Sequence, residues 1–454
     1  MVQKQSITPD YGKFLLWENY SEELLLEYRQ SVEEGLELSS YQELFEAVAK
    51  LPTGHDKRRF ADLLSEVVQK AGMQENYPYT EPSDWEGILS CCQPWEKELP
   101  DVEKATLRQR ISGAWYGRIV GCLLGKPVEG FHTDDLIPML KDSGNYPMHR
   151  YILSTEVPSH LAEKYPYPLS QKCFIDQIDA APLDDDTNYT VLYQQLIEQY
   201  GREFTPADVA QTWLDLQPKK AYCSAERVAY RNIVAGYYPP KSAIYQNPYR
   251  EWIGAQIRAD YFGYINPGKP LAAAEMAWRD ASVSHIKNGI YGELFAAAMI
   301  SAAAVCDDIP EIIHIGLSLV PSKSRLYEGV SAIIENWKHG MSREDCFGAI
   351  HSQWDEHNAH DWCHTISNAQ IVTAALLYGE NDFGRTICMA VDCGFDTDCN
   401  AATVGSILGM KNGLSSIEER WISPLCGQLK TAIFDMEQVS IEALIDKTLE
   451  HIKR

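Results

Sequence analysis

Apolar residues three and four positions apart recur along nearly the whole chain, and this spacing restricts it to a fold built from helices. The pattern is clearest in EELLLEYRQSVEEGLELSSYQELFEAVAKL (22–51) and DKRRFADLLSEVVQKAG (56–72). Runs of alternating Val, Ile and Thr, which are typical of strands, are scarce. The sequence therefore predicts an all-α protein.

The same spacing places further helices along the second part of the chain. We expect them over residues 188–201, 206–216, 270–282, 288–305, 325–340 and 401–413. A softer stretch, NYPYTEPSDWEGILSCCQPWEKELPD, ends near residue 100 and predicts two domains, a helical N-terminal extension (1–100) and a larger domain (101–454). A helix should begin with Asp101 as its N-cap, and the proline-containing stretch from Leu140 to Asp184 is expected to be an irregular insertion.

Four glycines follow one another at four-residue intervals in DVEKATLRQRISGAWYGRIVGCLLG (101–125). These are Gly113, Gly117, Gly121 and Gly125. They lay a stripe without side chains along one helix face, although each costs about 1 kcal/mol relative to alanine. The stripe predicts close approach of a second helix, and Gly125, at its end, is a candidate for close approach of a ligand.

The charge balance excludes some classes of partner. The 454 residues hold 40 Lys and Arg against 64 Asp and Glu, a formal net charge of −24, which disfavours nucleic acid and anionic membrane surfaces. The longest apolar run, 294–305, is shorter than the ~20 residues of a membrane span. The first residues lack a signal-peptide pattern and the twelve cysteines form no CxxC pair, so we expect a cytoplasmic protein.

Two short acidic clusters each precede a helical pattern. Asp184, Asp185 and Asp186 stand before one helix, and Asp396 and Asp398 lie within VDCGFDTDCNAATVGSILG (391–409). Each cluster alone could be a helix cap or a solvated turn. If the two meet, however, like charges ~4 Å apart repel by ~4 kcal/mol per pair at an effective dielectric constant of 20. Two divalent cations would relieve this repulsion, and oxygen ligands select Mg²⁺, Mn²⁺ or Ca²⁺.

Four motifs resemble a known family when they are taken in order. They are GAWYGRIVGCLLGKPVEG (113–130), LDDDTNYT (183–190), ASVSHIKNGIYGELFAAAMISAA (281–303) and VDCGFDTDCNAATVGSILG (391–409). This order is similar to that of the ADP-ribosylglycohydrolase family, over roughly residues 106–415 and not over residues 1–100. The resemblance implies a compact multi-helix domain, a pair of magnesium ions and hydrolysis of a ribosyl bond.

The resemblance also assigns roles to individual residues. It implies metal ligation by Asp185, Asp186, Asp396 and Asp398, and we add Asp184 from the same motif. Asp184 departs from the family, which usually has threonine there, and so does Cys399, since a thiol is a poor Mg²⁺ ligand. Glu129 matches an acidic residue beside the scissile ribose and is expected, with Asp186, to be catalytic. Gly125 and His285 are the expected substrate-binding residues. A further departure is Cys122, which follows Gly121 where the family usually has aspartate.

These residues favour one function and leave two others open. The preferred interpretation is a hydrolase with two divalent cations, expected to be Mg²⁺ with Mn²⁺ or Ca²⁺ as alternatives, that removes ADP-ribose from a modified protein side chain. The alternatives are a hydrolase of a smaller riboside, nucleoside or glycoside, and an ADP-ribose-binding or immunity-type protein with weak or no turnover. Residues 1–100 could contact a partner or a second copy. The spacing of His357, His360 and His364 beside Cys363 also permits a zinc site, although no distant further ligand supports it.

Overall fold

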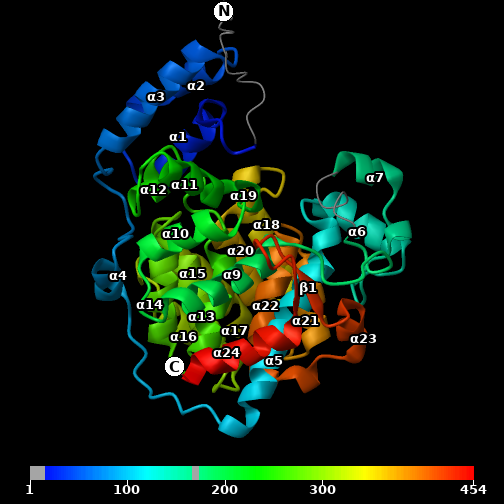
Figure 1. Cartoon of the computed structure of the whole chain (residues 1–454). Coiled ribbons are helices and arrows are strands. Elements are labelled where there is room, and N and C mark those ends of the chain that lie inside the picture. Colours follow the sequence, from blue (N-terminus) through cyan, green and yellow to red (C-terminus); the bar gives the residue numbers. More distant parts are fainter. Residues whose placement is uncertain (1–15, 166–172, 454) are drawn as a thin grey trace, which may run out of the picture.

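The computed structural model describes residues 16–165 and 173–453 and is mostly helical, which confirms the predicted fold class. The N-terminal region contains α1 (Leu24–Glu33), α2 (Gln42–Ala49), α3 (His55–Lys70) and α4 (Trp85–Cys91). Figure 1 shows α1 to α3, in blue, beside the larger helical body. In the part of the chain described, strands are confined to the antiparallel pair β1 (Gln428–Lys430) and β2 (Gln438–Ser440).

The helices of the body follow the predicted segments closely. They are α5 (Lys104–Gly125), α6 (Thr133–Asp142), α7 (Ser159–Lys164), α9 (Asp185–Tyr200), α10 (Pro206–Leu216), α11 (Ser224–Val234), α12 (Lys241–Ile244), α13 (Asp260–Ile265), α14 (Pro270–Ala281), α15 (Lys287–Ala303), α16 (Ile309–Leu317), α17 (Arg325–Lys338), α18 (Arg343–Gln353), α19 (Ala359–Cys363), α20 (Thr365–Tyr378), α21 (Phe383–Asp392), α22 (Thr397–Asn412), α23 (Glu419–Ile422) and α24 (Ile441–Lys453). Each of the six segments expected to be helical overlaps one of these helices, although α9, α15 and α22 begin three, one and four residues earlier than expected. No helix in the described ranges is long and apolar enough to cross a membrane.

One predicted boundary was wrong. Helix α5 begins at Lys104 with Glu103 as its N-cap, not with Asp101, and the Glu103 side chain makes no capping hydrogen bond. Asp101 is exposed and lies in non-helical chain. Among its described residues, the predicted insertion between Leu140 and Asp184 is irregular apart from the end of α6, the 3₁₀ turn Ser154–Glu156 and the short α7. Residues 166–172 of it lie outside the described residues.

The glycine stripe brings α5 against α22. A Cβ atom at Gly113, Gly117 or Gly121 would lie 2.0–2.1 Å from the carbonyl oxygens of Gly409, Gly405 or Ala401, respectively. Because rising numbers on α5 meet falling numbers on α22, the two helices run antiparallel, with the end of α5 beside the start of α22. The predicted helix contact is therefore confirmed, and it places the Asp396–Asp398 segment next to Gly125.

This contact predicts a large difference between two Gly→Ala substitutions. Gly117→Ala should lower the free energy of unfolding by about 1–3 kcal/mol, because its Cβ would meet the backbone of Gly405 at 2.1 Å. Gly348→Ala on α18 is the matched control, since no atom lies within 4 Å of its Cβ position and alanine favours the helix. Thermal unfolding of both variants tests the contact, and equal melting temperatures would contradict it.

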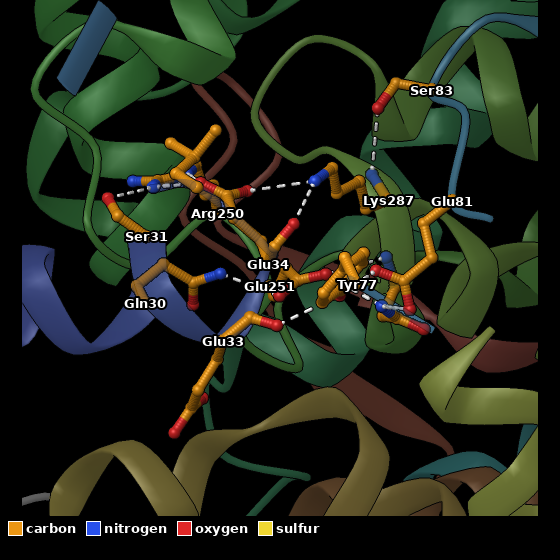
Figure 2. Close-up of polar contacts among 12 residues, drawn as sticks. Gln30, Ser31, Glu33, Glu34, Tyr77, Glu81, Ser83, Arg250, Glu251 and Lys287 are labelled. Carbon is orange, nitrogen blue, oxygen red and sulfur yellow. Dashed lines mark hydrogen bonds and ion pairs between the residues drawn. The ribbon is translucent and has the colours of Figure 1, made fainter. Parts of the chain in front are cut away.

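The N-terminal region has a small core and a buried polar interface with the body. The core contains Tyr20, Leu24, Phe45, Val48, Ala61 and Leu64. Figure 2 shows the interface, in which Arg250 binds Glu27 (2.7 Å) and Glu34, and Gln30 donates to Glu251 (2.7 Å). Arg325 binds both Glu81 (2.8 Å) and Glu251 (2.7 Å). Breaking such a buried pair on one side costs several kcal/mol, so these contacts fix α1 to the body.

Candidate functional site

The two acidic clusters, far apart in the sequence, meet in space. Asp184 caps α9, where its Oδ1 accepts the Asp186 N–H (2.9 Å), and Asp396 stands at the N-cap of α22. One ligand atom each from Cys122, Asp184, Asp186 and Asp398 lies within 4.8 Å of the others. The same holds for Asp396, Asp398 and Cys399. Asp398 therefore belongs to both groups and joins the start of α9 to the start of α22.

Two cationic side chains balance part of this negative charge. Lys126 forms an ion pair with Asp184, and Arg118 lies 2.7 Å from Asp186 and 3.0 Å from Asp260. Although burial opposes it, the Lys126 ammonium lowers the pKa of Asp184. The carboxyl groups of Glu129, Asp185, Asp186, Asp396 and Asp398 share the site, so two protein cations leave a clear excess of negative charge.

Burial raises the pKa of the other carboxyl groups of the site, including Asp186 beside Arg118. The pKa of Asp185 rises to about 7 through burial and the neighbouring Asp184, and burial raises that of Asp396 to about 6. Burial also raises the pKa of Asp398 well above its usual range, helped by Glu129, and that of Glu129 despite nearby Lys126. Without cations, Asp185 is therefore partly protonated at neutral pH, whereas Asp396 is mostly ionised.

The donor set fits hard divalent cations. Asp186 Oδ2 and Asp398 Oδ1 are buried and have no hydrogen-bond partner among the described residues. An orphaned buried carboxylate oxygen costs free energy that a bound cation recovers. Burial raises the pKa values of the two thiols at the site, Cys122 and Cys399, and a thiol is a poor ligand for Mg²⁺, so the carboxylate oxygens are the preferred ligands. The metal assignment itself remains a prediction.

The carboxylates open into a cavity of about 390 Å³. Glu129, Asp185, Asp396 and Cys399 line it, together with the aromatic side chains of Trp17, Tyr165, Trp252 and Trp362. The volume lies within the usual range for small-molecule sites. Glu129 directly follows the short helical turn Lys126–Val128 at the end of α5, so the glycine contact with α22 also sets its distance from Asp396 and Asp398.

The structure separates the two expected substrate-binding residues from one another. Gly125 is buried at the end of α5, where a Cβ atom would lie 2.4 Å from the Asp398 nitrogen, so its close neighbour is protein backbone. His285 is fully buried, bonds Ser284 Oγ through Nδ1 (2.8 Å) and does not line the cavity. Burial lowers the pKa of His285 well below normal and keeps the ring neutral.

Two histidines of the possible zinc cluster, His360 and His364, lie with Glu33 of α1 so that one ligand atom of each is within 4.8 Å of the others, whereas His357 groups with His132 and Asp134. His357 packs on His132, with ring centroids 4.1 Å apart. His360 Nδ1 accepts the Trp252 indole N–H (3.0 Å), so its Nε2 carries the proton and faces Glu33 (2.9 Å). His364 Nδ1 accepts the Ile366 N–H. Both ring nitrogens of His360 are thus engaged by Trp252 and Glu33, and the zinc site stays a prediction.

Two residues that line the cavity were missed from the sequence. Glu226, on α11, is buried and binds Arg258 (2.7 Å), and burial raises its pKa. It stands alone in an amphipathic helix, so no acidic motif marks it. Trp17 lies before the region of family resemblance, and nothing in its neighbouring sequence indicates a pocket. The position of each residue at the cavity becomes evident only when segments distant in the sequence pack together.

Comparison with protein-family models identifies the type of domain. A family model described as ADP-ribosylglycohydrolase matches residues 103–453. A solved structure described as an "ADP-ribosylglycohydrolase-related protein complex" is similar at 17% identity and a TM-score of 0.49, and the match covers 77% of this chain and 99% of that one. A search of curated proteins found no match.

Proposed function

Because the chain belongs to the ADP-ribosylglycohydrolase family, we propose that it is a metal-dependent hydrolase that cleaves a ribosyl N- or O-glycosidic bond. One observation carries this proposal. The acidic starts of α9 and α22 converge on a cavity that Glu129 also lines. Carboxylates gathered around a sugar-sized cavity suit a reaction that builds positive charge on the anomeric carbon.

The site residues divide the chemistry among them. Asp185, Asp186, Asp396 and Asp398 would hold two divalent cations, and Arg118 and Lys126 orient Asp186 and Asp184 beside them. Bound cations supply a grip on ribose hydroxyls and a lower pKa for a water molecule. Cys399 replaces a hydroxyl ligand of the family and weakens one of the two cation sites.

Glu129 is the proposed proton carrier. Its carboxyl lines the cavity, and burial raises its pKa despite nearby Lys126, so it can hold a proton for the leaving atom. In its ionised form, Glu129 can instead accept a proton from the attacking water. Glu226 lies on the same cavity and could accept a hydrogen bond from a sugar hydroxyl.

The proposed substrate is a protein side chain that carries ADP-ribose, as the family name suggests. A smaller riboside is the second candidate, because Leu16 and Trp17 of the N-terminal region line the same cavity and narrow the space around the carboxylates. An ADP-ribose-binding protein with weak turnover is the third, since Asp184, Cys122 and Cys399 depart from the family pattern.

A panel of substrates tests the proposal. We expect purified protein with Mg²⁺ or Mn²⁺ to release ribose or ADP-ribose from at least one of ADP-ribosyl-arginine, ADP-ribosyl-serine and simple ribosides, and EDTA to abolish release. Liquid chromatography of the products gives the cleaved bond. Absence of turnover on the entire panel, with tight ADP-ribose binding in calorimetry, would favour the binding protein and reject the hydrolase.

A further inference from the structure

The N-terminal region supplies part of the wall of the catalytic cavity, although it precedes the residues that match the family. Leu16 and Trp17 line the cavity together with Glu129, Asp185 and Asp396. Trp17 packs against a buried cluster that contains Tyr249 and Trp252 of the body. The segment before α1 is therefore part of the site as well as part of the fold.

Trp17 is held in place by charged residues of the body. The Arg227 guanidinium lies 4.9 Å from the centre of the Trp17 ring, a cation–π contact. The next residue, Glu18, forms an ion pair with Lys219 (2.9 Å), and its carbonyl oxygen accepts a hydrogen bond from Arg231 (3.1 Å). With its ring and its backbone both anchored, Trp17 presents a pre-organised surface to a ligand.

A second tryptophan of the wall is also fixed by the N-terminal region. The indole N–H of Trp252 donates to His360 Nδ1 (3.0 Å), and His360 Nε2 donates to Glu33 of α1 (2.9 Å). The buried contacts in Figure 2 fix α1 to the body. The region thus acts on the wall twice, through the ring of Trp17 and through the orientation of Trp252.

We propose that the N-terminal region is a specificity element of the enzyme, and that Trp17, with Trp252 and Trp362, binds a planar aromatic group carried by the ribosyl substrate. This inference rests on the proposed function, since it takes the carboxylates to hold the ribose. Rigid aromatic rings bind other flat rings by stacking at little cost in conformational entropy, whereas a bare sugar would leave this part of the cavity wet. The ring could be attached at C1, as the leaving group, or at C5 of the ribose.

The test compares aromatic and aliphatic ribosides in the full-length protein. The probes are 4-nitrophenyl D-ribofuranoside, with its ring at C1, methyl 5-O-benzoyl-D-ribofuranoside, with its ring at C5, and methyl D-ribofuranoside, each as both anomers. In Trp17→Ala, the ratio of kcat/KM for an aromatic probe to that for the methyl riboside should fall about ten- to a hundred-fold, chiefly through KM. Trp17→Phe should recover much of it.

Phe60→Ala is the matched control, because Phe60 is an exposed aromatic residue on α3 of the same region and does not line the cavity. It should leave the ratio as in the wild type. If Trp17→Ala lowers kcat/KM equally for the aromatic and methyl probes, the ratio is unchanged and Trp17 has a structural role only. That result, or no loss on any probe, would overturn the proposal. The position of the ring follows from which aromatic probe loses activity.

A binding measurement separates this proposal from the hydrolase assignment. Calorimetric titration with 4-nitrophenyl and methyl 5-O-benzoyl ribofuranoside should show about ten-fold weaker binding of at least one of them to Trp17→Ala than to the wild type. If the wild type hydrolyses nothing yet shows this difference, the hydrolase proposal fails and the aromatic wall stands. If the wild type binds neither probe, or if both proteins bind the probes equally well, the proposed binding of an aromatic group by Trp17 is overturned.

Discussion

Asp398→Asn is expected to lower kcat/KM at least about a thousand-fold while raising the melting temperature of the metal-free protein. Asp398 is the carboxylate shared by both ligand groups, and its Oδ1 has no partner among the described residues. In the proposed site, the substitution would remove a ligand for a cation that would stabilise the transition state by several kcal/mol. It also removes a group whose pKa is raised by burial and by Glu129, so the metal-free fold loses a source of repulsion.

Opposite changes in activity and stability distinguish this role from a structural one. A residue that only supports the fold would lower the melting temperature when replaced. The control is Asp307→Asn, because Asp307 is exposed and distant in sequence from both acidic clusters. It should match the wild type in kcat/KM and in thermal unfolding with and without Mg²⁺. Wild-type activity in Asp398→Asn would contradict the metal assignment.

The helical scaffold could be predicted because its signals are local. The pattern in PADVAQTWLDL gave the bounds of α10 to the residue, since Thr205 forms a capping box with Asp208 and Pro206 occupies the first turn. The glycine stripe predicted a helix contact, and α22 meets it. Asp101 misled because an acidic residue before a helical pattern resembles an N-cap, whereas α5 starts three residues later.

The site could be predicted only where a motif marks it. The clusters at Asp184 and Asp396 can be recognised in the sequence as charged residues in apolar surroundings, and the structure brings them together. Trp17 and Glu226 carry no such mark, because an isolated tryptophan or glutamate has no spacing from which a pocket can be inferred. The sequence also did not reveal all the positive charges of the site. Lys126 and Arg118 are recognised as counter-charges only in the structure, where they lie buried beside Asp184 and Asp186.

The affinity for Mg²⁺ is expected to fall at least about twenty-fold between pH 8 and pH 6. A cation must displace the protons that the metal-free site retains, and the pKa values of about 7 for Asp185 and about 6 for Asp396 place this competition in that range. Each displaced proton weakens binding by up to about ten-fold per pH unit below the pKa of its group. Calorimetry in buffers of different ionisation enthalpy would measure both the affinity and the protons released.

The stability of the metal-free protein should change with pH in the direction opposite to the affinity for Mg²⁺, which provides a second check. Because these two pKa values are raised on folding, their contribution to the free energy of unfolding is fully present below about pH 4 and is lost as the pH rises through 6 and 7. The stabilisation by Mg²⁺ should therefore grow from pH 6 to pH 8. Asp392 is buried away from the cavity and has a pKa of about 7. Its ionisation as the pH rises therefore lowers the stability of the metal-free and metal-bound proteins alike. The difference between EDTA and Mg²⁺ at each pH isolates the site, and a difference independent of pH would mean that cations bind elsewhere.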